Sequence, residues 1–389
     1  MAGPARTTLV LAAFISMVDR SVMPPLVPVV AADLGVSIEA VGHSLTVYAV
    51  AYAAFQLVWS TLSTRWGRIR VLTVSTAVSG IANIGSALAT DPLTYSVTRG
   101  ISGAAFSATI TAVLIYFGDT LTMKQRAIAT ANLAAAISLG LTAGTVGAGV
   151  IAQWWSWRWV YVVIAVACAV LAVALARLTE PAAGTTERLL PSIRRLAGNR
   201  WALAILFLTV VEGALLIGVF NYLPVALQAE GATVLQAGLV TAAFGVTVVI
   251  VSQLMKLVLG HWPPWLLLAL AGLSMVGAYT VLTLTVSLLS VLTGTSLLGL
   301  AWALGHTTIQ TWMTDAVADG RAIGMAFFSI SLFVGASIGA ALGNVAASGD
   351  GFAVLFLAAA VASAFFAAAS STARARYRVR EPPTGDPSG

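Results

Sequence analysis

Long apolar stretches separated by short polar loops fill almost the whole chain. Each stretch reaches the roughly 20 residues that a helix needs to cross a bilayer, and none shows a strict alternation of apolar and polar positions. Strands would need such an alternation and a closed barrel, so the pattern indicates helices. We predict twelve spanning helices, over residues 8–30, 40–63, 71–89, 93–117, 127–152, 158–177, 202–227, 235–259, 264–283, 287–313, 322–347 and 351–372.

The composition agrees with a chain that has lipid as its solvent. Of the 389 residues, 59% are hydrophobic and only 9% are charged, whereas soluble proteins carry about 25% charged residues. The predicted partner of most of the surface is therefore the lipid bilayer. The single cysteine, Cys168, lies in an apolar stretch, so no disulfide framework is expected.

The positive charges gather in alternate loops. Nearly all Lys and Arg residues outside the spans fall on one predicted face, and Arg158 is alone on the other. By the positive-inside rule this distribution predicts a multi-pass protein of the cytoplasmic (plasma) membrane with both termini in the cytoplasm. It also explains the net charge of +6 without a nucleic-acid site, so no nucleic-acid partner is expected.

The longest polar stretch divides the spans six and six. We predict an N-terminal six-helix bundle over 1–178, a cytoplasmic linker over 179–200, a C-terminal six-helix bundle over 201–373 and a cytoplasmic tail over 374–389. In each half two glycines follow an arginine at the same spacing, and an aspartate precedes that arginine at a similar distance. Duplicated transporter halves often show such repeats. The matching residues are Asp119, Arg126, Gly140 and Gly144 in one half and Asp315, Arg321, Gly335 and Gly339 in the other.

The loop after the second predicted helix carries the most specific motif. Residues 60–72 read STLSTRWGRIRVL and resemble the signature G-x-L-x-D-R-x-G-R-x-x-x-L of the major facilitator superfamily. Ser60 replaces the first glycine and Thr64 the aspartate. The resemblance implies a latch that holds the cytoplasmic side shut, formed by Arg65, Gly67, Arg68 and Asp119.

Two further motifs resemble those of the superfamily's drug:proton antiporters. Arg99 to Gly103 reads RGISG, similar to R-x-x-x-G, and residues 140–149 read GLTAGTVGAG, similar to G-x-x-x-G-P-x-x-G-G with Thr145 in place of proline. Small residues such as Gly140 and Gly144 let helices pack closely. A buried Arg99 would tune the protonation of a nearby carboxylate; the alternative is that it snorkels to the membrane surface.

Asp19, in the middle of the first span, is the strongest candidate for proton binding. A carboxylate there is costly and therefore functional by default. The alternative is that Asp19 and the adjacent Arg20 form a pair that only neutralises itself. Adjacent side chains on a helix point about 100° apart, however, and share no face well. Glu212 in the seventh span is a second candidate acid, unless it only pairs with Lys256 or a loop arginine.

Several polar residues could line a substrate path. Tyr48, Tyr52 and Gln56 form one stripe at a spacing of four, and His306 and Gln310 share a face in the same way. Asn221 and Tyr222 lie in the span that carries Glu212. Each set could instead serve only bonds between helices.

Other function classes lack support in the sequence. It has no phosphate-binding G-x-x-x-x-G-K-[ST] loop, no clustered His/Cys metal site and no catalytic triad pattern. We therefore expect no enzyme activity, no metal and no cofactor, with a proton gradient as the energy source. A membrane sensor would need a substantial soluble domain, which the short polar stretches do not provide.

The residues and the resemblance lead to one hypothesis. The chain resembles twelve-span drug or metabolite:proton antiporters of the superfamily, and this implies two pseudo-symmetric six-helix bundles that work as a monomer by alternating access. We expect proton-coupled export of a small amphipathic or hydrophobic substrate. The alternative is symport of an organic anion or lysolipid, as in spinster-type transporters, with Arg20 binding the anion; Phe106 stands where that group has a glutamate, which counts against this version.

Overall fold

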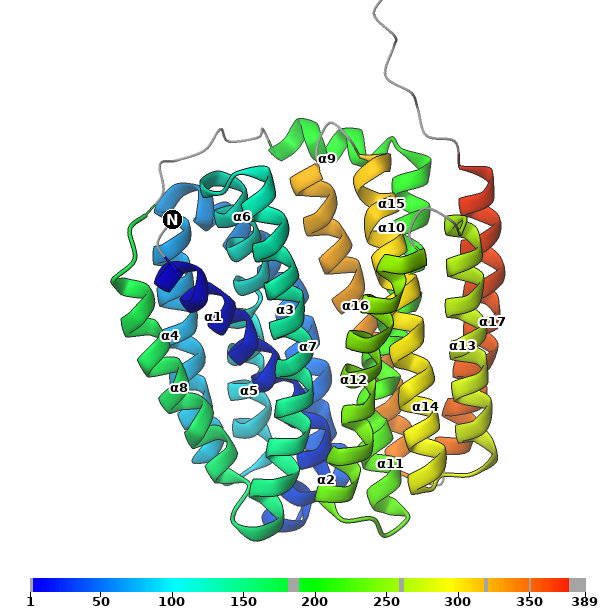
Figure 1. Ribbon diagram of the computed structural model, residues 1–389. Coiled ribbons are helices and arrows are strands. Elements are labelled where there is room, and N and C mark those ends of the chain that lie inside the picture. The colour runs from blue at the N-terminus through cyan, green and yellow to red at the C-terminus, as the bar shows by residue number, and fades with distance from the viewer. Residues whose placement is uncertain (1–2, 181–188, 259–261, 318–320, 350, 378–389) are drawn as a thin grey trace, which may run out of the picture.

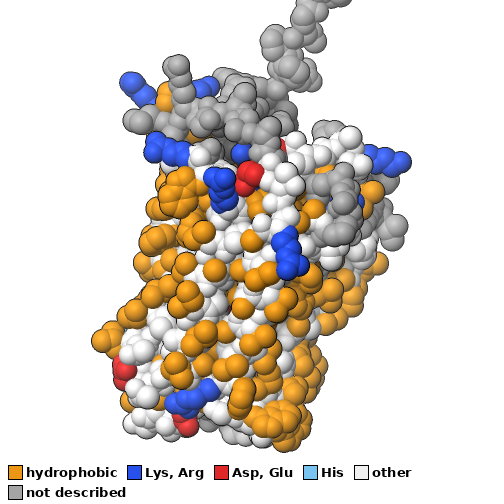
Figure 2. Space-filling model, turned by 90° about the vertical axis from the view of Figure 1, so that its left-hand side faces the viewer, with side chains coloured by type: hydrophobic (Ala, Val, Ile, Leu, Met, Phe, Trp, Pro, Cys, Tyr) orange, Lys and Arg blue, Asp and Glu red, His pale blue; other side chains and the backbone are white. Residues whose placement is uncertain are grey.

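The computed structural model describes residues 3–180, 189–258, 262–317, 321–349 and 351–377. Within these ranges the chain is almost entirely helical (Figure 1). Ten helices are long and apolar enough to cross a membrane, and an eleventh span consists of the pair α1 (Gly3–Ser21) and α2 (Met23–Leu34), bent by 45°. Apolar side chains cover the middle of the face in Figure 2, and charged side chains lie toward its two ends. The predicted all-helical membrane fold is confirmed.

Eight of the predicted spans are continuous helices. They lie within a few residues of the predicted ranges: α3 (Ile38–Trp66), α4 (Arg68–Ala87), α7 (Met123–Trp154), α8 (Arg158–Ala176), α12 (Val234–Val258), α13 (Pro264–Leu284), α16 (Arg321–Ala347) and α17 (Phe352–Arg376). Of these, only α4 falls short of the apolarity that marks a membrane span. Several of its polar side chains, including Ser75, Ser79 and Asn83, are fully buried in the bundle.

The first, fourth, seventh and tenth spans are interrupted. Pro24, Pro25 and Pro28 already indicate an interruption of the first span, whereas the other three depart from the continuous helices that we predicted. The fourth is α5 (Pro92–Phe106) and α6 (Thr109–Thr120). The seventh runs from α10 (Arg200–Gly213) through a π-helical segment, η1 (Ala214–Val219), and a short 3₁₀ turn, η2 (Phe220–Tyr222), to α11 (Leu223–Ala229). The tenth is α14 (Leu288–Ala301), the π-helical η3 (Trp302–His306) and α15 (Thr307–Ala316).

The helices pack in two groups that divide at the middle of the chain. In the first half α1 packs on α7, α3 on α5 and α4 on α8; in the second α10 packs on α16, α12 on α14 and α13 on α17. The halves touch mainly along two helix pairs, α3 with α16 and α7 with α12, and α2 makes smaller contacts with α11 and α12. Figure 1 shows the first half in blue to green and the second in green to red.

Glycines place α7 and α16 in equivalent positions in the two halves. A Cβ atom on Gly144 of α7 would lie 2.8 Å from the carbonyl oxygen of Val18, and one on Gly339 of α16 would lie 2.1 Å from that of Ala214. Gly140 and Gly335 approach the same two spans one turn earlier. Only glycine permits these distances, so each half brings a backbone against its first span in the same way.

The two ends of the bundle differ in charge. A helix that the sequence did not predict, α9 (Leu189–Ala197), lies across one end, and both described ends of the chain lie near it (Figure 1). We call this the α9 end and the other the α2 end. The linker residues 181–188 and the tail beyond 377 lie outside the described residues. Basic residues at the α9 end include Arg65, Arg68, Arg70, Arg177, Arg194, Arg195 and Arg200.

Candidate transport site

A fully buried ion pair lies inside the first half. Asp19, near the end of α1, accepts a hydrogen bond from Arg99 Nη1 at 3.0 Å, and Ser102 donates to its other oxygen at 2.9 Å. Both charged side chains are 0% exposed. The structure therefore brings together Asp19 and Arg99, which lie 80 residues apart and which the sequence marked separately as candidates for proton coupling.

Arg99 does not reach the membrane surface. Its Nε donates to Ser86 on α4 at 2.9 Å, and its guanidinium carbon lies 4.5 Å from the centre of the Tyr161 ring on α8. Such a cation–π contact is strongest where water is excluded. Four helices thus hold this one cation, and the snorkelling alternative is wrong.

The helix that carries Arg99, α5, has a capped N-terminus. Asp91 caps this helix, accepting from the backbone N–H of Thr94 at 2.9 Å and from its hydroxyl at 2.6 Å. These hydrogen bonds hold the pKa of Asp91 below its usual range. The cap is therefore charged at neutral pH, and its contribution to stability is lost as the pH falls through that lowered pKa.

Arg20 points away from Asp19 and into a small pocket between the halves. Its guanidinium carbon lies 5.5 Å from the centre of the Phe333 ring on α16. Among the described residues no carboxylate lies within ion-pair distance of it. The pocket is lined by Arg20, Met23, Leu45, Tyr48, Ala49, Ile217, Asn221 and Phe333. Three of the predicted substrate residues, Arg20, Tyr48 and Asn221, thus share one pocket.

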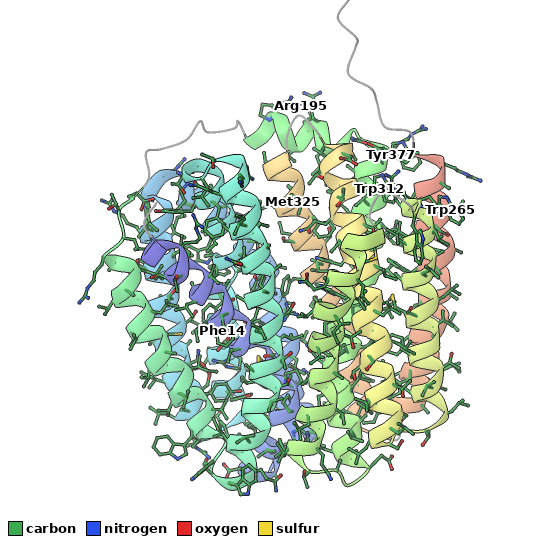
Figure 3. The ribbon with its side chains drawn as sticks, in the orientation of Figure 1. Phe14, Arg195, Trp265, Trp312, Met325 and Tyr377 are labelled. Carbon is green, nitrogen blue, oxygen red and sulfur yellow. The ribbon has the colours of Figure 1, made fainter. Side chains whose placement is uncertain are left out.

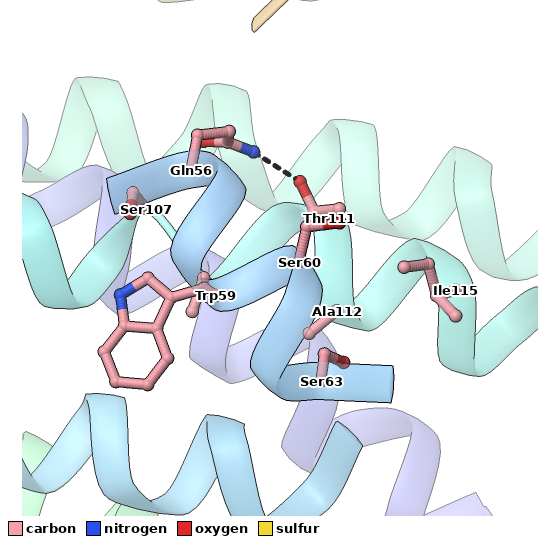
Figure 4. Close-up of a pocket in the computed structure, with 9 residues that line it drawn as sticks. Gln56, Trp59, Ser60, Ser63, Ser107, Thr111, Ala112 and Ile115 are labelled. Carbon is pink, nitrogen blue, oxygen red and sulfur yellow. Dashed lines mark hydrogen bonds between the residues drawn. The ribbon is translucent and has the colours of Figure 1, made fainter. Parts of the chain in front are cut away.

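The predicted stripe on α3 divides between two places. Tyr52 stacks on Phe333 across the interface, with ring centres 3.7 Å apart. Gln56 instead donates to Thr111 on α6 at 2.6 Å, in a groove within the first half that Trp59 also lines (Figure 4). The structure therefore separates Gln56 from the pocket at Arg20.

Tyr222 lies at the α2 end of the interface. Its hydroxyl is within hydrogen-bond distance of the carbonyl oxygen of Gly42 (3.3 Å) and of Asn344 Oδ1 (3.2 Å). The Asn344 amide lies 3.3 Å from His43 Nδ1. Together with a bond from Gln228 to the Pro25 carbonyl oxygen, these contacts join the halves at this end. The sequence did not mark Asn344 or His43, because neither belongs to a motif.

Glu212 and His306 meet inside the second half. Glu212 Oε2 lies 3.4 Å from His306 Nδ1, and the Glu212 side chain is 0% exposed. Gln310, one turn beyond His306, takes no described part in this pair. The Lys256 side chain, the alternative partner for Glu212, lies outside the described residues.

The latch motif forms an ion pair at the α9 end. Arg68 Nη2 lies 2.9 Å from Asp119 Oδ2. Gly67 has φ +102°, a conformation that side chains rarely adopt. The carboxylate of Glu180 caps α4 by accepting from the backbone N–H groups of Arg68, Ile69 and Arg70. Arg65 is exposed.

Solved transporters share this architecture at low sequence identity. A bacterial homolog of the human lysosomal transporter Spinster, in an inward-facing and unoccupied conformation, superposes with a TM-score of 0.78 at 15% identity, over 96% of this chain and 98% of that one. A D-xylose–proton symporter gives 0.77 at 15% identity over 93% and 96%, and the nucleoside transporter NupG 0.75 at 12% over 97% and 100%. These identities establish the fold alone.

Sequence comparison gives the family. No curated protein matches the chain significantly. The family model described as the Major Facilitator Superfamily matches residues 9–324, which is most of the chain. That match agrees with the two six-span halves, the interrupted first, fourth, seventh and tenth spans and the motif after α3. The chain belongs to the major facilitator superfamily and is a secondary transporter of that type.

Proposed function

We propose that this protein exports a small amphipathic substrate in exchange for protons, by alternating access of its two halves. The observation that carries the proposal is the buried Asp19–Arg99 pair at 3.0 Å. Removing one partner of a buried ion pair leaves the other charge uncompensated, at a cost of about 3–5 kcal/mol. A proton that neutralises Asp19 likewise leaves the charge of Arg99 buried and uncompensated. Proton binding therefore favours a rearrangement that gives Arg99 another partner or exposes it to water.

The charge distribution supports placing the α9 end in the cytoplasm. Basic residues concentrate there, whereas Arg158 at the α2 end is paired with Asp33. The hydrogen bonds of Tyr222, Asn344 and Gln228 close the interface at the α2 end. In this assignment the conformation is closed to the outside, with Asp19 ionised and held by Arg99.

The seam between α7 and α12 supports export. Cβ atoms added to Gly149 and Gly238 would lie 3.0 Å from Leu235 Cα and 2.5 Å from the Thr145 carbonyl oxygen. The two backbones are therefore in contact across the halves, and small residues at such a contact let helices shift against each other. Within the superfamily, the motif that residues 140–149 resemble marks exporters.

One observation favours a second candidate, proton-coupled symport of an organic anion or lysolipid. Arg20 is turned into the pocket between the halves without a described carboxylate partner. A substrate carboxylate or phosphate would supply the missing charge. Its apolar part would contact Met23, Leu45 and Phe333.

The test is proton flux in proteoliposomes with a pH dye trapped inside. Lipophilic cations, organic anions and lysolipids are offered to wild type and to Asp19→Asn. Antiport predicts that a substrate triggers proton release from an acidic lumen and that the variant loses this release. Protons that move together with an anion would establish the symport candidate, and a wild-type flux indifferent to pH would refute both.

A further inference from the structure

Glu212 differs from Asp19 in having no permanent cation beside it. Its Oε2 atom lies 3.4 Å from His306 Nδ1, and its Oε1 atom has no hydrogen-bond partner among the described residues. His306, which is itself titratable, is the one described ion-pair partner of Glu212. Arg99, by contrast, stays charged at any physiological pH.

The surroundings of the pair are aromatic. The Trp302 ring stacks on the imidazole of His306 with centres 4.0 Å apart, and the Phe328 ring centre lies 5.4 Å away. An isolated carboxylate in such an environment is costly and is neutralised by a proton or a cation. His306 is 13% exposed, so the buried acid has a partner that protons can reach.

The other charged side chains on neighbouring elements form no described ion pair with Glu212 or His306. On α10 itself and on the elements that pack against α10, η3 and α15, the other described ionisable residues are Arg194, Arg195, Arg200, Tyr279, Asp315, Arg374 and Arg376. Arg194, Arg195, Arg200 and Asp315 are exposed at the α9 end, and Arg374 lies over the Trp312 and Tyr377 rings. Figure 3 shows Arg195, Trp312 and Tyr377 toward this end. Tyr279 donates to the carbonyl oxygen of Leu215. The side chains of Lys256 and Arg321 lie outside the described residues.

The backbone on both sides of the pair is irregular. Glu212 stands just before the π-helical segment η1, and His306 is the last residue of the π-helical segment η3. Such π-helical segments are rare in proteins as a whole, and those that occur are often found at functional sites. They change the direction in which side chains point along the helix. The only two described π segments thus adjoin the two members of this pair.

The pair is not a copy of the Asp19 site. Gly140 approaches the carbonyl oxygen of Phe14, and Gly335 approaches that of Val210. By this correspondence, Leu215 is the second-half equivalent of Asp19, and Ser16 is the first-half equivalent of Glu212. Each half therefore carries a buried acid at a position where the other half has none.

We propose that Glu212 and His306 form a second proton-binding site, separate from Asp19. The pair takes up one proton, shared between the carboxylate and the imidazole, and its net charge changes from −1 to 0. No bond other than that to the proton forms or breaks. Proton binding here does not depend on the transport function proposed above; its role in coupling does.

Infrared difference spectroscopy of the full-length protein in lipid nanodiscs tests this site without a substrate. Buffer pH is raised in steps, and the carboxylic-acid C=O band is followed in wild type, Glu212→Gln, His306→Gln and Asp19→Asn. Thr209→Val, a near-isosteric change one turn before Glu212, is the matched control. We expect a titrating band that Glu212→Gln removes and that Asp19→Asn and Thr209→Val retain.

The histidine variant tests the sharing of the proton. His306→Gln removes the imidazole that can carry positive charge beside the carboxylate. In this variant the band should therefore persist to a pH at least about one unit higher than in the wild type, which is a tenfold change in proton affinity. A band unchanged in both Glu212→Gln and His306→Gln would overturn the proposal. If His306→Gln fails to fold, the presence or loss of the band in the isosteric Glu212→Gln variant still decides. The antiport proposal is judged separately, by the flux of Asp19→Asn.

Discussion

Replacing Asp19 by Asn should destabilise the protein through Arg99 rather than through lost packing. The two side chains are 0% exposed and 3.0 Å apart. At an effective dielectric constant of about 20, two unit charges at that distance attract by about 5–6 kcal/mol. Desolvation offsets much of this in the intact pair, but the single change leaves Arg99 buried and unpaired, which costs about 3–5 kcal/mol.

A double-mutant cycle measures this coupling. Asp19→Asn, Arg99→Gln and the double variant are unfolded by denaturant in detergent micelles, and the free energies are compared with wild type. Because each single variant leaves one buried charge and the double variant leaves none, the double variant should be no less stable than the worse single variant. If the effects of the two changes simply add, the two side chains do not act as a pair and the reasoning fails.

Three further predictions follow from contacts elsewhere. Gly339→Val should disrupt the packing of α16 on η1, because even a Cβ atom at this position would lie 2.1 Å from the carbonyl oxygen of Ala214. It should lower the thermal unfolding temperature by more than the control Ala341→Val, which changes an exposed position of the same helix. Glu180→Gln should cost about 0.3–1 kcal/mol of unfolding free energy, because it removes a negative charge from the N-terminus of α4. A loss equal to that of an exposed Glu230→Gln control would contradict this role of Glu180. Arg20→Gln should weaken transport of anionic substrates at least tenfold more than that of neutral ones in a competition assay; equal losses would remove Arg20 from anion recognition.

The apolar pattern alone predicted nearly all of the helical architecture. Its predicted ranges agree closely with helices such as α8 and α13, because lipid demands an unbroken apolar run about as long as the bilayer is thick. The pattern also located α4, whose serine-rich sequence is the least apolar of the eight continuous spans. The breaks at η1 and η3 were missed because neither segment contains a proline and both lie inside long apolar runs.

The site was predicted only in part. A lone charge inside a span is conspicuous, so Asp19, Arg99 and Glu212 stood out, but their partners depend on how helices face one another. The pairing of Glu212 with His306, the unpaired position of Arg20 and the contact of Tyr222 with Asn344 all arise from tertiary packing. Glu180, the cap of α4, carries no local signal because the helix that it caps lies more than 100 residues earlier.

If the charge on Asp19 controls which end of the interface is closed, the distance between the two halves at the α2 end should depend on that charge. Leu93 on α5 and Leu289 on α14 lie at this end in opposite halves, and each is 73% exposed. Spin labels on cysteines at both positions, in a Cys168→Ala background, report their separation by electron paramagnetic resonance at neutral pH. Because Asp19→Asn mimics the protonated acid, we expect a longer separation in this variant than in the wild type. Identical distance distributions with Asp and with Asn at position 19 would contradict it.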